Sequence, residues 1–440
     1  MYSLFILFIK ICIISGETLK IAYFTDTYEP QINGVVISIK LSIQNLRKNG
    51  HEVYIFCPSG SKKDEYTFPV FSKKFKNYPE YKIGFPSFDL IKKIKKIKPD
   101  IIHIHTPATI GMAGLAIAKL FDIPIVTTYH TLLKDYMSYI TSEKLGDQFI
   151  DMYTLWFFDR SSTIIAPSTP IKKILVKNGI KKPIKVLPTP IDVNMISKKS
   201  KNKNKKFTIL HVGRLCKEKR IEVVLDAFKD VLKQIDAKLI ITSAGPDEKR
   251  LKNLADNLNI SKNVKFTGYL PVESLKKLYS ASNIFVSASD TETQGLVVLE
   301  AMANGCPVIA RNALGFKDVI KDGKNGLLFD RKDELSEKII LLFKDKKLRS
   351  RLIKGGLRTA SELNSENYIK KIEKIYKENF KSTYNTISSK IFYSCFLFLN
   401  LFLYWFLKNI RLSINSRLIN LYLRFIRILL SLKIFNKLMY

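Results

Sequence analysis

Short apolar runs alternate with amphipathic segments along most of the chain. The runs at residues 19–24, 207–212 and 283–289 are short and rich in β-branched and aromatic residues, which is typical of buried strands. Two further runs, within 99–107 and 123–131, also read as strands, and each ends in a histidine. This alternation in both halves of the chain predicts an α/β protein with two Rossmann-like parallel-sheet domains facing across a cleft.

Amphipathic helices are predicted between these strands. From about Val35 to Asn49, apolar residues recur on one face, and Gly50 provides a stop. From Leu90 to Lys98, leucine and isoleucine form one stripe while lysine occupies most other positions. This second helix is expected to cover a sheet, and its lysine face also suits the headgroups of an anionic membrane.

The length of 440 residues is that of two domains. Their boundary is predicted at the run 197–206, which is lysine-rich, lacks apolar residues and is typical of a solvated linker. We therefore expect one domain at 19–196 and another at 207–385. An apolar extension, 1–18, precedes them, and a hydrophobic to amphipathic tail, 386–440, follows them.

Two glutamates mark a strand-to-helix turn in the second half of the chain. Glu292 lies in the turn, and Glu300 lies in the following helix, which Gly305 ends. The free amides of residues 293–296, which include Gly295, point where an anion can bind. The amides suit phosphate and the carboxylates suit sugar hydroxyls, so the pattern favours a sugar nucleotide. An ordinary helix with two exposed acids is the alternative.

A second strand-to-turn motif carries positive charge. Gly213 and Arg214 follow the strand at 207–212, and Lys219 lies five positions after Arg214. A departing diphosphate needs a divalent metal or fixed cations to stabilise its charge. The chain contains no Asp-x-Asp pair, so we expect no metal, with Arg214 supplying a planar fork and Lys219 a point charge.

Together the two motifs resemble the retaining glycosyltransferases of family GT4, which have the two-domain GT-B fold. The resemblance spans roughly residues 20–331. It implies that Arg214 and Lys219 grip the donor diphosphate beside Gly213. It also implies that Glu292 approaches the transferred sugar and that Glu300 holds the ribose.

The first half of the chain agrees with this resemblance. Gly34 resembles the position whose backbone comes close to the donor phosphate, and His130 resembles the histidine between the acceptor and donor sugars. A histidine there could orient a hydroxyl or a phosphate oxygen. His103 and His105 alternate along one strand, so one of them is expected to face the core. Ligands of open α/β sheets bind beyond the carboxyl ends of strands, so the expected acceptor side comprises Asp26, Asn33, His105 and Tyr129.

Three further expectations come from the resemblance. Residues 25–35 are most similar to the branch that glycosylates diacylglycerol. A helix at about 366–380 is expected to pack back on the first domain. The nucleotide sugar is implied as a co-substrate, with no cofactor and no metal for the core chemistry.

The charge balance points to an anionic partner. Lysine and arginine number 73 against 39 acidic residues, a formal net charge of +34. Nucleic acid or an anionic membrane would explain this excess. The chain has no recognised nucleic-acid-binding motif, whereas the basic helix at 90–98 and the tail suit a lipid surface. A compositional bias toward isoleucine and lysine is the alternative explanation.

The tail carries the clearest membrane pattern. Residues 391–407 contain no charge and, as a helix, would extend about 25 Å, so they predict either one membrane span or a deeply embedded segment. Residues 408–440 have seven basic residues, no acid and a polar stripe at helical spacing, which is typical of a helix lying in the membrane interface. A partner-binding helix is the alternative.

The cysteines and the amino terminus bear on location. The five cysteines are scattered and lack metal-ligand spacing, which indicates reduced thiols in a cytosolic compartment. Residues 1–15 lack a basic start, so they make a poor signal peptide and are interpreted as a membrane contact or an upstream start codon. We expect the cytoplasmic face of the cell membrane.

The leading hypothesis is a hexosyltransferase that moves a hexose from a UDP-sugar, glucose or galactose, to diacylglycerol with retention. The alternatives within enzymes are transfer to phosphatidylinositol or to a soluble glycan precursor. The alternative from another class is a catalytically inactive basic membrane-surface protein.

Overall fold

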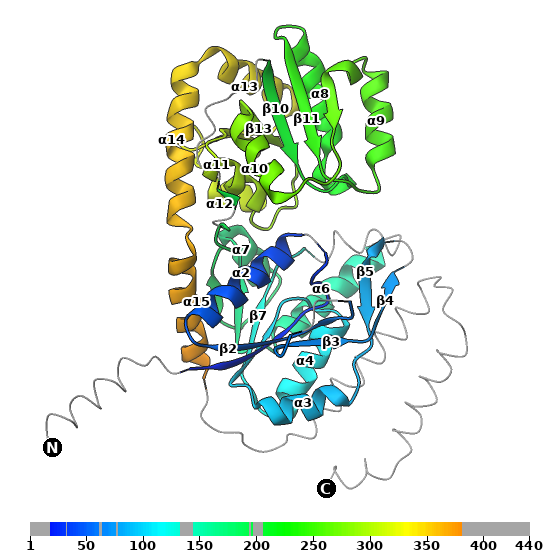
Figure 1. Cartoon of the computed structure of the whole chain (residues 1–440), viewed down its shortest axis with the longest axis vertical. Coiled ribbons are helices and arrows are strands. Elements are labelled where there is room, and N and C mark those ends of the chain that lie inside the picture. Colours follow the sequence, from blue (N-terminus) through cyan, green and yellow to red (C-terminus); the bar gives the residue numbers. More distant parts are fainter. Residues whose placement is uncertain are drawn as a thin grey trace, which may run out of the picture. The chain divides into compact units, whose positions relative to one another are not determined.

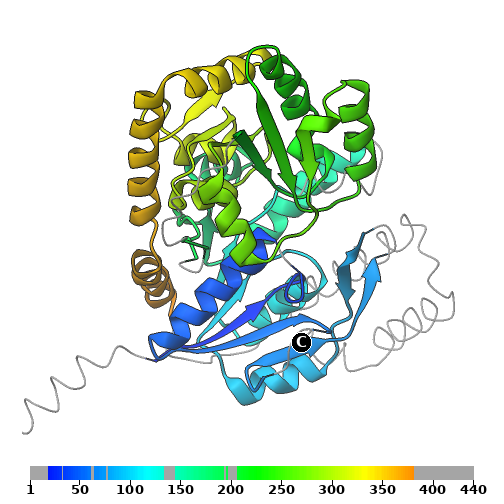
Figure 2. The same cartoon turned by 45° about the horizontal axis from the view of Figure 1, so that its top comes forward.

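The computed structural model describes residues 18–31, 33–60, 64–75, 78–132, 144–192, 195–196 and 206–380. They form two compact α/β units, whose elements are labelled in Figure 1 and turned by 45° in Figure 2. Of the described residues, the first unit contains 18–129, 144–164 and 374–380, and the second contains 130–132 and those from 165 to 373. The expected domain limits at 19–196 and 207–385 stay a prediction.

The first sheet has seven strands in the order β3-β2-β1-β6-β7-β8-β9. They are β1 (Lys20–Phe24), β2 (Glu52–Pro58), β3 (Thr67–Val70), β6 (Ile101–Ile104), β7 (Ile125–Thr128), β8 (Thr163–Ala166) and β9 (Ile184–Val186). β1 pairs in parallel with β2 and β6, and Phe24 lies opposite both Phe56 and Ile104. The central strands β1, β6, β7 and β8 are buried along nearly their whole length, as expected for a parallel sheet with both faces covered.

Helices connect these strands. They are α2 (Gly34–Lys48), α3 (Asp89–Ile97), α4 (Thr109–Leu120), α6 (Lys144–Phe158) and α7 (Thr169–Lys177), and an antiparallel hairpin adds β4 (Ser72–Phe75) and β5 (Tyr78–Gly84). The predicted helices at 35–49 and 90–98 are present, each beginning one residue earlier. In α3 the apolar stripe Leu90, Ile94 and Ile97 is buried, so this helix covers the domain as predicted and turns lysines to solvent.

The second sheet has six parallel strands in the order β12-β11-β10-β13-β14-β15. They are β10 (Phe207–Val212), β11 (Ala237–Thr242), β12 (Val264–Phe266), β13 (Ile284–Ser287), β14 (Val308–Arg311) and β15 (Leu327–Phe329). Alternate residues of β10 enter two separate cores, Ile209 on one face and Leu210 on the other. Helices therefore cover both faces, which is the predicted Rossmann-like arrangement.

The connections of the second sheet are helical. The α-helices are α8 (Ile221–Leu232), α9 (Glu248–Asn257), α10 (Val272–Ala281), α11 (Leu296–Ala303), α12 (Leu314–Val319), α13 (Lys332–Lys344) and α14 (Lys346–Glu362), and η2 (Lys217–Lys219) and η3 (Ser261–Asn263) are short 3₁₀ turns. One core combines α8, α9 and α13 with the sheet, and the other combines α10, α11 and α12.

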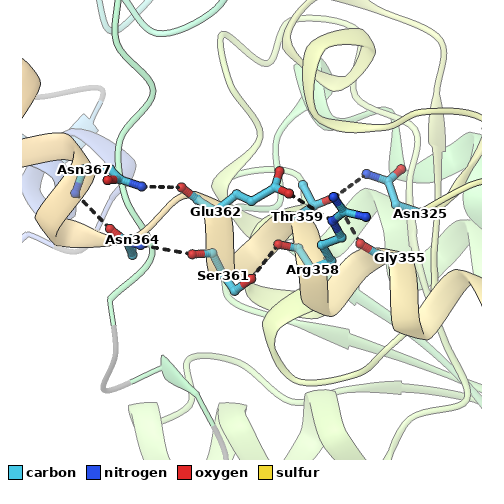
Figure 3. Close-up of polar contacts among 8 residues, drawn as sticks. All are labelled: Asn325, Gly355, Arg358, Thr359, Ser361, Glu362, Asn364 and Asn367. Atoms are coloured by element: carbon cyan, nitrogen blue, oxygen red, sulfur yellow. Dashed lines mark hydrogen bonds and ion pairs between the residues drawn. The ribbon is translucent and has the colours of Figure 1, made fainter.

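The turn between α14 and α15 (Ser365–Asn379) is fixed by short polar contacts (Figure 3). The Asn364 carboxamide oxygen accepts the Asn367 amide at 2.9 Å, which caps the start of α15, and its nitrogen donates to the Ser361 carbonyl at 3.2 Å. The Asn325 side chain donates to Thr359 Oγ1 at 2.8 Å, which ties α14 to the loop before β15. The connection between the two helices is therefore a hydrogen-bonded turn.

The last helix returns to the first unit, as predicted for residues 366–380. The boundary between the units falls within α15, at Lys374. The buried Tyr376 hydroxyl lies 2.9 Å from the Tyr23 hydroxyl and 2.7 Å from His103 Nδ1. One buried polar network thus joins strands β1 and β6 of the first sheet to α15, the last described helix.

Three sequence predictions lie wholly or largely outside the described residues: the extension 1–18, the linker 197–206 and the tail 386–440 with its segment 391–407. Within the described part of the chain, no helix has the length and apolar character needed to cross a bilayer.

Candidate active site

The turn between β13 and α11 depends on two glycines. Gly295 has φ +83°, and a Cβ on it would lie 2.4 Å from Cε1 of Phe316. A Cβ on Gly315 would lie 2.5 Å from the Thr293 carbonyl carbon, and the Gly315 amide donates to the Glu292 carbonyl at 2.9 Å. A side chain on Gly295 would collide with Phe316 of α12, and a side chain on Gly315 would collide with the turn, so the two glycines let the turn pack tightly against α12.

Side chains of the second unit also hold this turn from outside. Ser168 Oγ donates to the Thr293 carbonyl at 2.6 Å, and Thr293 Oγ1 donates to the His130 carbonyl at 2.8 Å. The buried Gln294 carboxamide makes two 2.8 Å bonds with the backbone of Thr189, accepting from its amide and donating to its carbonyl. Glu292 is therefore presented from a rigid turn.

Lys219 and Glu292 form a half-buried ion pair. Lys219 Nζ donates to Glu292 Oε1, and the two side chains are 22% and 18% exposed. Burial lowers the pKa of Lys219, but the Glu292 carboxylate more than offsets this and raises it. The structure thus brings together two residues that the sequence assigned to one site across 73 positions.

The turn after β10 carries the positively charged residues of the predicted site. Gly213 and Arg214 follow the strand, and Lys219 ends the 3₁₀ turn η2 instead of opening a long helix. Arg220, with φ +51°, interrupts the path into α8, and its guanidinium bonds Asp290 at 2.8 Å. This second ion pair, which no sequence motif indicated, fixes the turn after β10 against the segment that leads to Glu292.

Glu300 lies in α11, behind the turn. The residue is 9% exposed, and its carboxylate accepts a 3.0 Å hydrogen bond from the Tyr279 hydroxyl of α10. Burial raises the pKa of Glu300 to about 7; the Tyr279 hydrogen bond lowers it, while Asp192 raises it further. This carboxyl titrates near neutral pH, so its charge responds to whatever binds beside it.

Two histidines of the second unit are neutral at physiological pH. Burial lowers the pKa of His130 to about 3. His211, which the sequence analysis did not select, is 1% exposed, and burial lowers its pKa to about 4, with Lys219 acting in the same direction. Its Nδ1 donates to the Val286 carbonyl at 3.0 Å, which leaves Nε2 as the acceptor nitrogen. A Cβ on Gly213 would lie 3.5 Å from that Nε2.

The candidates of the first unit have structural partners. Asp26 accepts four hydrogen bonds at the start of α4, from Thr106 and Thr109 hydroxyls and from the Ile110 and Gly111 amides, at 2.7–3.1 Å. Burial raises the pKa of Asp26, and these bonds act in the opposite direction. The carboxylate therefore caps α4, whose amide-rich start favours a negative charge.

The remaining candidates of this unit lie at strand ends and a helix start. Asn33 caps α2 through a 3.0 Å bond from the Val36 amide, and Gly34 is the first residue of that helix. His105 and Tyr129 are 2% and 5% exposed, and the His105 ring lies 4.1 Å from that of His103. His103 lies in β6 and His105 follows its end. Both residues are buried, so neither side chain faces solvent. The predicted acceptor contacts of Asp26, Asn33, His105 and Tyr129 stay predictions.

The described residues contain no group of three or more histidine, cysteine, aspartate or glutamate side chains that could hold a metal ion. Cys57, Cys216 and Cys306, the cysteines in the described part of the chain, are buried. Burial raises the pKa of the Cys216 thiol, which lies in the cationic turn, so it is not a reactive thiolate there.

Sequence comparisons agree with this arrangement of two domains. The profile of Glycosyltransferase Family 4 matches residues 32–195, and that of Glycosyl transferases group 1 matches residues 192–359. The alpha-monoglucosyldiacylglycerol synthase of Streptococcus pneumoniae is 31% identical over 403 residues, which cover 85% of this chain and 91% of the relative. The protein of the same name from Acholeplasma laidlawii is 29% identical over 399 residues, with 81% and 96% covered.

Solved structures share the fold. Sucrose-phosphate synthase from Thermosynechococcus elongatus gives a TM-score of 0.68 at 19% identity, covering 82% of this chain and 98% of that one. Anabaena Alr3699/HepE in complex with UDP-glucose gives 0.66 at 18% identity, covering 82% and 100%. With the profiles and the full-length relatives, these matches establish that the chain belongs to the family 4 glycosyltransferases and is a hexosyltransferase with the GT-B fold.

Proposed function

We propose that the protein transfers a hexose from UDP-glucose or UDP-galactose to the hydroxyl of diacylglycerol, with retention of the anomeric configuration. The observation that carries this proposal is the similarity to two proteins named alpha-monoglucosyldiacylglycerol synthase, which extends over more than four-fifths of the chain. The fold neighbour in complex with UDP-glucose supports the choice of nucleotide.

The Lys219–Glu292 ion pair suggests how the donor enters. A donor diphosphate would draw the Lys219 ammonium and the Arg214 guanidinium to its oxygens, because both are cations suited to phosphate. Glu292, released from Lys219, would then accept hydrogen bonds from hydroxyls of the hexose. The ion pair thus keeps both charged groups partnered until the substrate replaces each partner.

The departing diphosphate would be stabilised by the Arg214 and Lys219 cations, which is the electrostatic contribution that lowers the barrier. In this scheme Glu300 holds the ribose, Gly34 and Gly213 allow close approach to the phosphates, and no metal is required. The acceptor hydroxyl attacks on the face that the diphosphate leaves, and its proton passes to a leaving phosphate oxygen. Neutral His130 orients groups at the reacting face.

A lipid acceptor also fits the surface of the first unit. Lys92, Lys95 and Lys96 of α3 are exposed, and Phe71 and Phe88 are 62% and 50% exposed. Lysines near an anionic leaflet each contribute about 1 kcal/mol, and exposed aromatic rings suit the interface. We place the enzyme at the cytoplasmic face of the cell membrane, where anionic lipid, diacylglycerol and sugar nucleotides meet.

The test is a labelled-product assay. Purified full-length protein is incubated with labelled UDP-glucose, UDP-galactose or GDP-mannose and with vesicles of diacylglycerol and phosphatidylglycerol, and the labelled lipid is identified. GDP-mannose is included because a relative from Mycobacterium tuberculosis, named GDP-mannose-dependent alpha-mannosyltransferase, is 27% identical over 330 residues. An α-hexosyl diacylglycerol formed from a UDP-sugar supports the proposal. Transfer only from GDP-mannose, or only to phosphatidylinositol or a soluble acceptor, contradicts it.

A further inference from the structure

A buried tyrosine lies directly behind the carboxylate that the proposed function assigns to the donor ribose. Tyr279, in α10, is 0% exposed, and its hydroxyl donates to Glu300 Oε2 at 3.0 Å. The same hydroxyl lies 3.4 Å from the Val297 carbonyl, so its stronger bond is to the carboxylate. The hydrogen bond from Tyr279 is made to Oε2 of Glu300 and does not involve Oε1 of the same carboxylate.

The Tyr279 ring is held independently of that bond. It belongs to the core formed by α10, α11 and α12 and lies 6.0 Å from the Phe285 ring of β13. The hydroxyl therefore has a fixed position and can restrict the rotation of the Glu300 carboxylate. A side chain needed only to fill this space would require no hydroxyl.

Few charged groups face Glu300. Asp192 is near enough to oppose its ionisation, and Tyr279 favours it. The side of α14 that packs against α11 is uncharged, since Leu352, Gly356 and Ala360 are its buried residues. The Asn304 carboxamide donates to the Glu300 backbone carbonyl, not to the carboxylate. The Tyr279 hydroxyl is therefore the neighbour in the described structure that stabilises the charged carboxylate.

We propose that Tyr279 is a positioning residue for donor binding: its hydroxyl fixes Oε2 of Glu300 so that Oε1 faces a hydroxyl of the nucleotide ribose. This inference rests on the proposed function and adds a residue to its donor site. Tyr279 touches the carboxylate and not the substrate, so it acts through Glu300.

A dependence on pH follows. The ionised carboxylate accepts hydrogen bonds from ribose hydroxyls, so donor binding favours the deprotonated form and affinity falls as pH drops through the pKa of Glu300. Removing the Tyr279 hydroxyl removes a group that lowers this pKa. The loss of affinity in Tyr279→Phe should therefore begin at higher pH than in the wild type.

The experiment is calorimetric binding of UDP-glucose and, in parallel, UDP-galactose to the full-length protein between about pH 5.5 and 8.5. The diphosphate of a sugar nucleotide does not titrate in this interval. We expect the wild-type midpoint near pH 7, a Tyr279→Phe midpoint higher by about one unit, and a roughly 5-fold weaker affinity at pH 7 that recovers at the alkaline end. Glu300→Gln should bind weakly with no such midpoint.

The matched control is Tyr376→Phe, which also removes a buried hydroxyl but in the first unit. It should leave the midpoint in place even if it lowers the melting temperature. A Tyr279→Phe midpoint equal to that of the wild type overturns the inference, as does an equal shift in Tyr376→Phe. If the wild type shows no loss of donor affinity at acid pH, the inference is also overturned, whatever the variants show. If the wild type binds neither sugar nucleotide saturably, the result contradicts the proposed function, and the inference falls with it.

Discussion

The ion pair between Lys219 and Glu292 unites the two motifs on which the functional argument depends. One residue ends a 3₁₀ turn after β10 and the other lies in the turn after β13, the neighbouring strand of the sheet. Both side chains are largely buried, so each charge needs a partner. In the proposed reaction the substrate supplies new partners to both.

Lys219→Ala should lower kcat/KM for the donor by about 10²-fold or more, because one fixed cation at the departing diphosphate is lost. Steady-state kinetics with varied donor measures this. Lys217→Ala is the matched control, since Lys217 is exposed on the same 3₁₀ turn. Equal effects of the two variants would show that general charge, and not position 219, matters.

Arg214→Ala should likewise cost on the order of 10²-fold in turnover, and Arg214→Lys should recover only part of it because lysine lacks the planar fork. Single-turnover rates with saturating donor separate this effect from weakened binding. Near-normal turnover in Arg214→Ala would remove Arg214 from its assigned role.

At the scale of elements, the β13–α11 turn is the most constrained segment of the site. Hydrogen bonds from Ser168, Gln294 and Gly315 fix its backbone, and Phe316 lies directly under Gly295. The turn therefore resists any side chain at its glycine and presents Glu292 with little freedom.

Gly295→Ala should lower the free energy of unfolding by about 2–4 kcal/mol, from a left-handed backbone and a collision with Phe316. Chemical denaturation measures the change. Gly323→Ala is the matched control, because Gly323 has φ +69° with open space around its Cβ position. It should show the backbone penalty alone, about 1–2 kcal/mol. Equal losses in the two variants would contradict the collision with Phe316.

The whole molecule combines a net charge of +34 with exposed lysines on the first unit. Charge of this kind acts over a Debye length of about 10 Å at ordinary salt, so it favours adsorption to anionic surfaces. In the proposed function, both the positions of the lysines and their number would favour an anionic membrane.

Replacing Lys92, Lys95 and Lys96 with glutamine should weaken binding to phosphatidylglycerol vesicles by roughly 1 kcal/mol for each lysine that meets the surface. Vesicle sedimentation at several salt concentrations measures this. The matched control replaces Lys249, Lys262 and Lys265, exposed lysines of the second unit, with glutamine. If both triple variants lose the same affinity, total charge and not the α3 face governs binding.

The features that were predicted from the sequence are those that depend on short-range patterns. The β10 limits, the helix at 35–49 and the turn between β13 and α11 followed from hydrophobic periodicity and glycine positions. The family resemblance placed Lys219 and Glu292 in one site, but their ion pair was not predicted. Tyr279 belongs to no local motif, because it becomes a neighbour of the site only when α10 packs against α11. His211 lies just before Gly213 in the sequence, but its bond to the Val286 carbonyl joins two separate strands. Asp26 shows the reverse case, since its position at a strand end was predicted but its bonds to α4 were not.

The central claim is transfer from a UDP-hexose to diacylglycerol, and the most direct measurement is UDP release by the purified full-length protein with vesicles that contain or lack diacylglycerol. We expect UDP release that depends on diacylglycerol and equals the α-hexosyl diacylglycerol formed, mole for mole. UDP release that is unchanged by diacylglycerol, or glycolipid formation without UDP release, would contradict it.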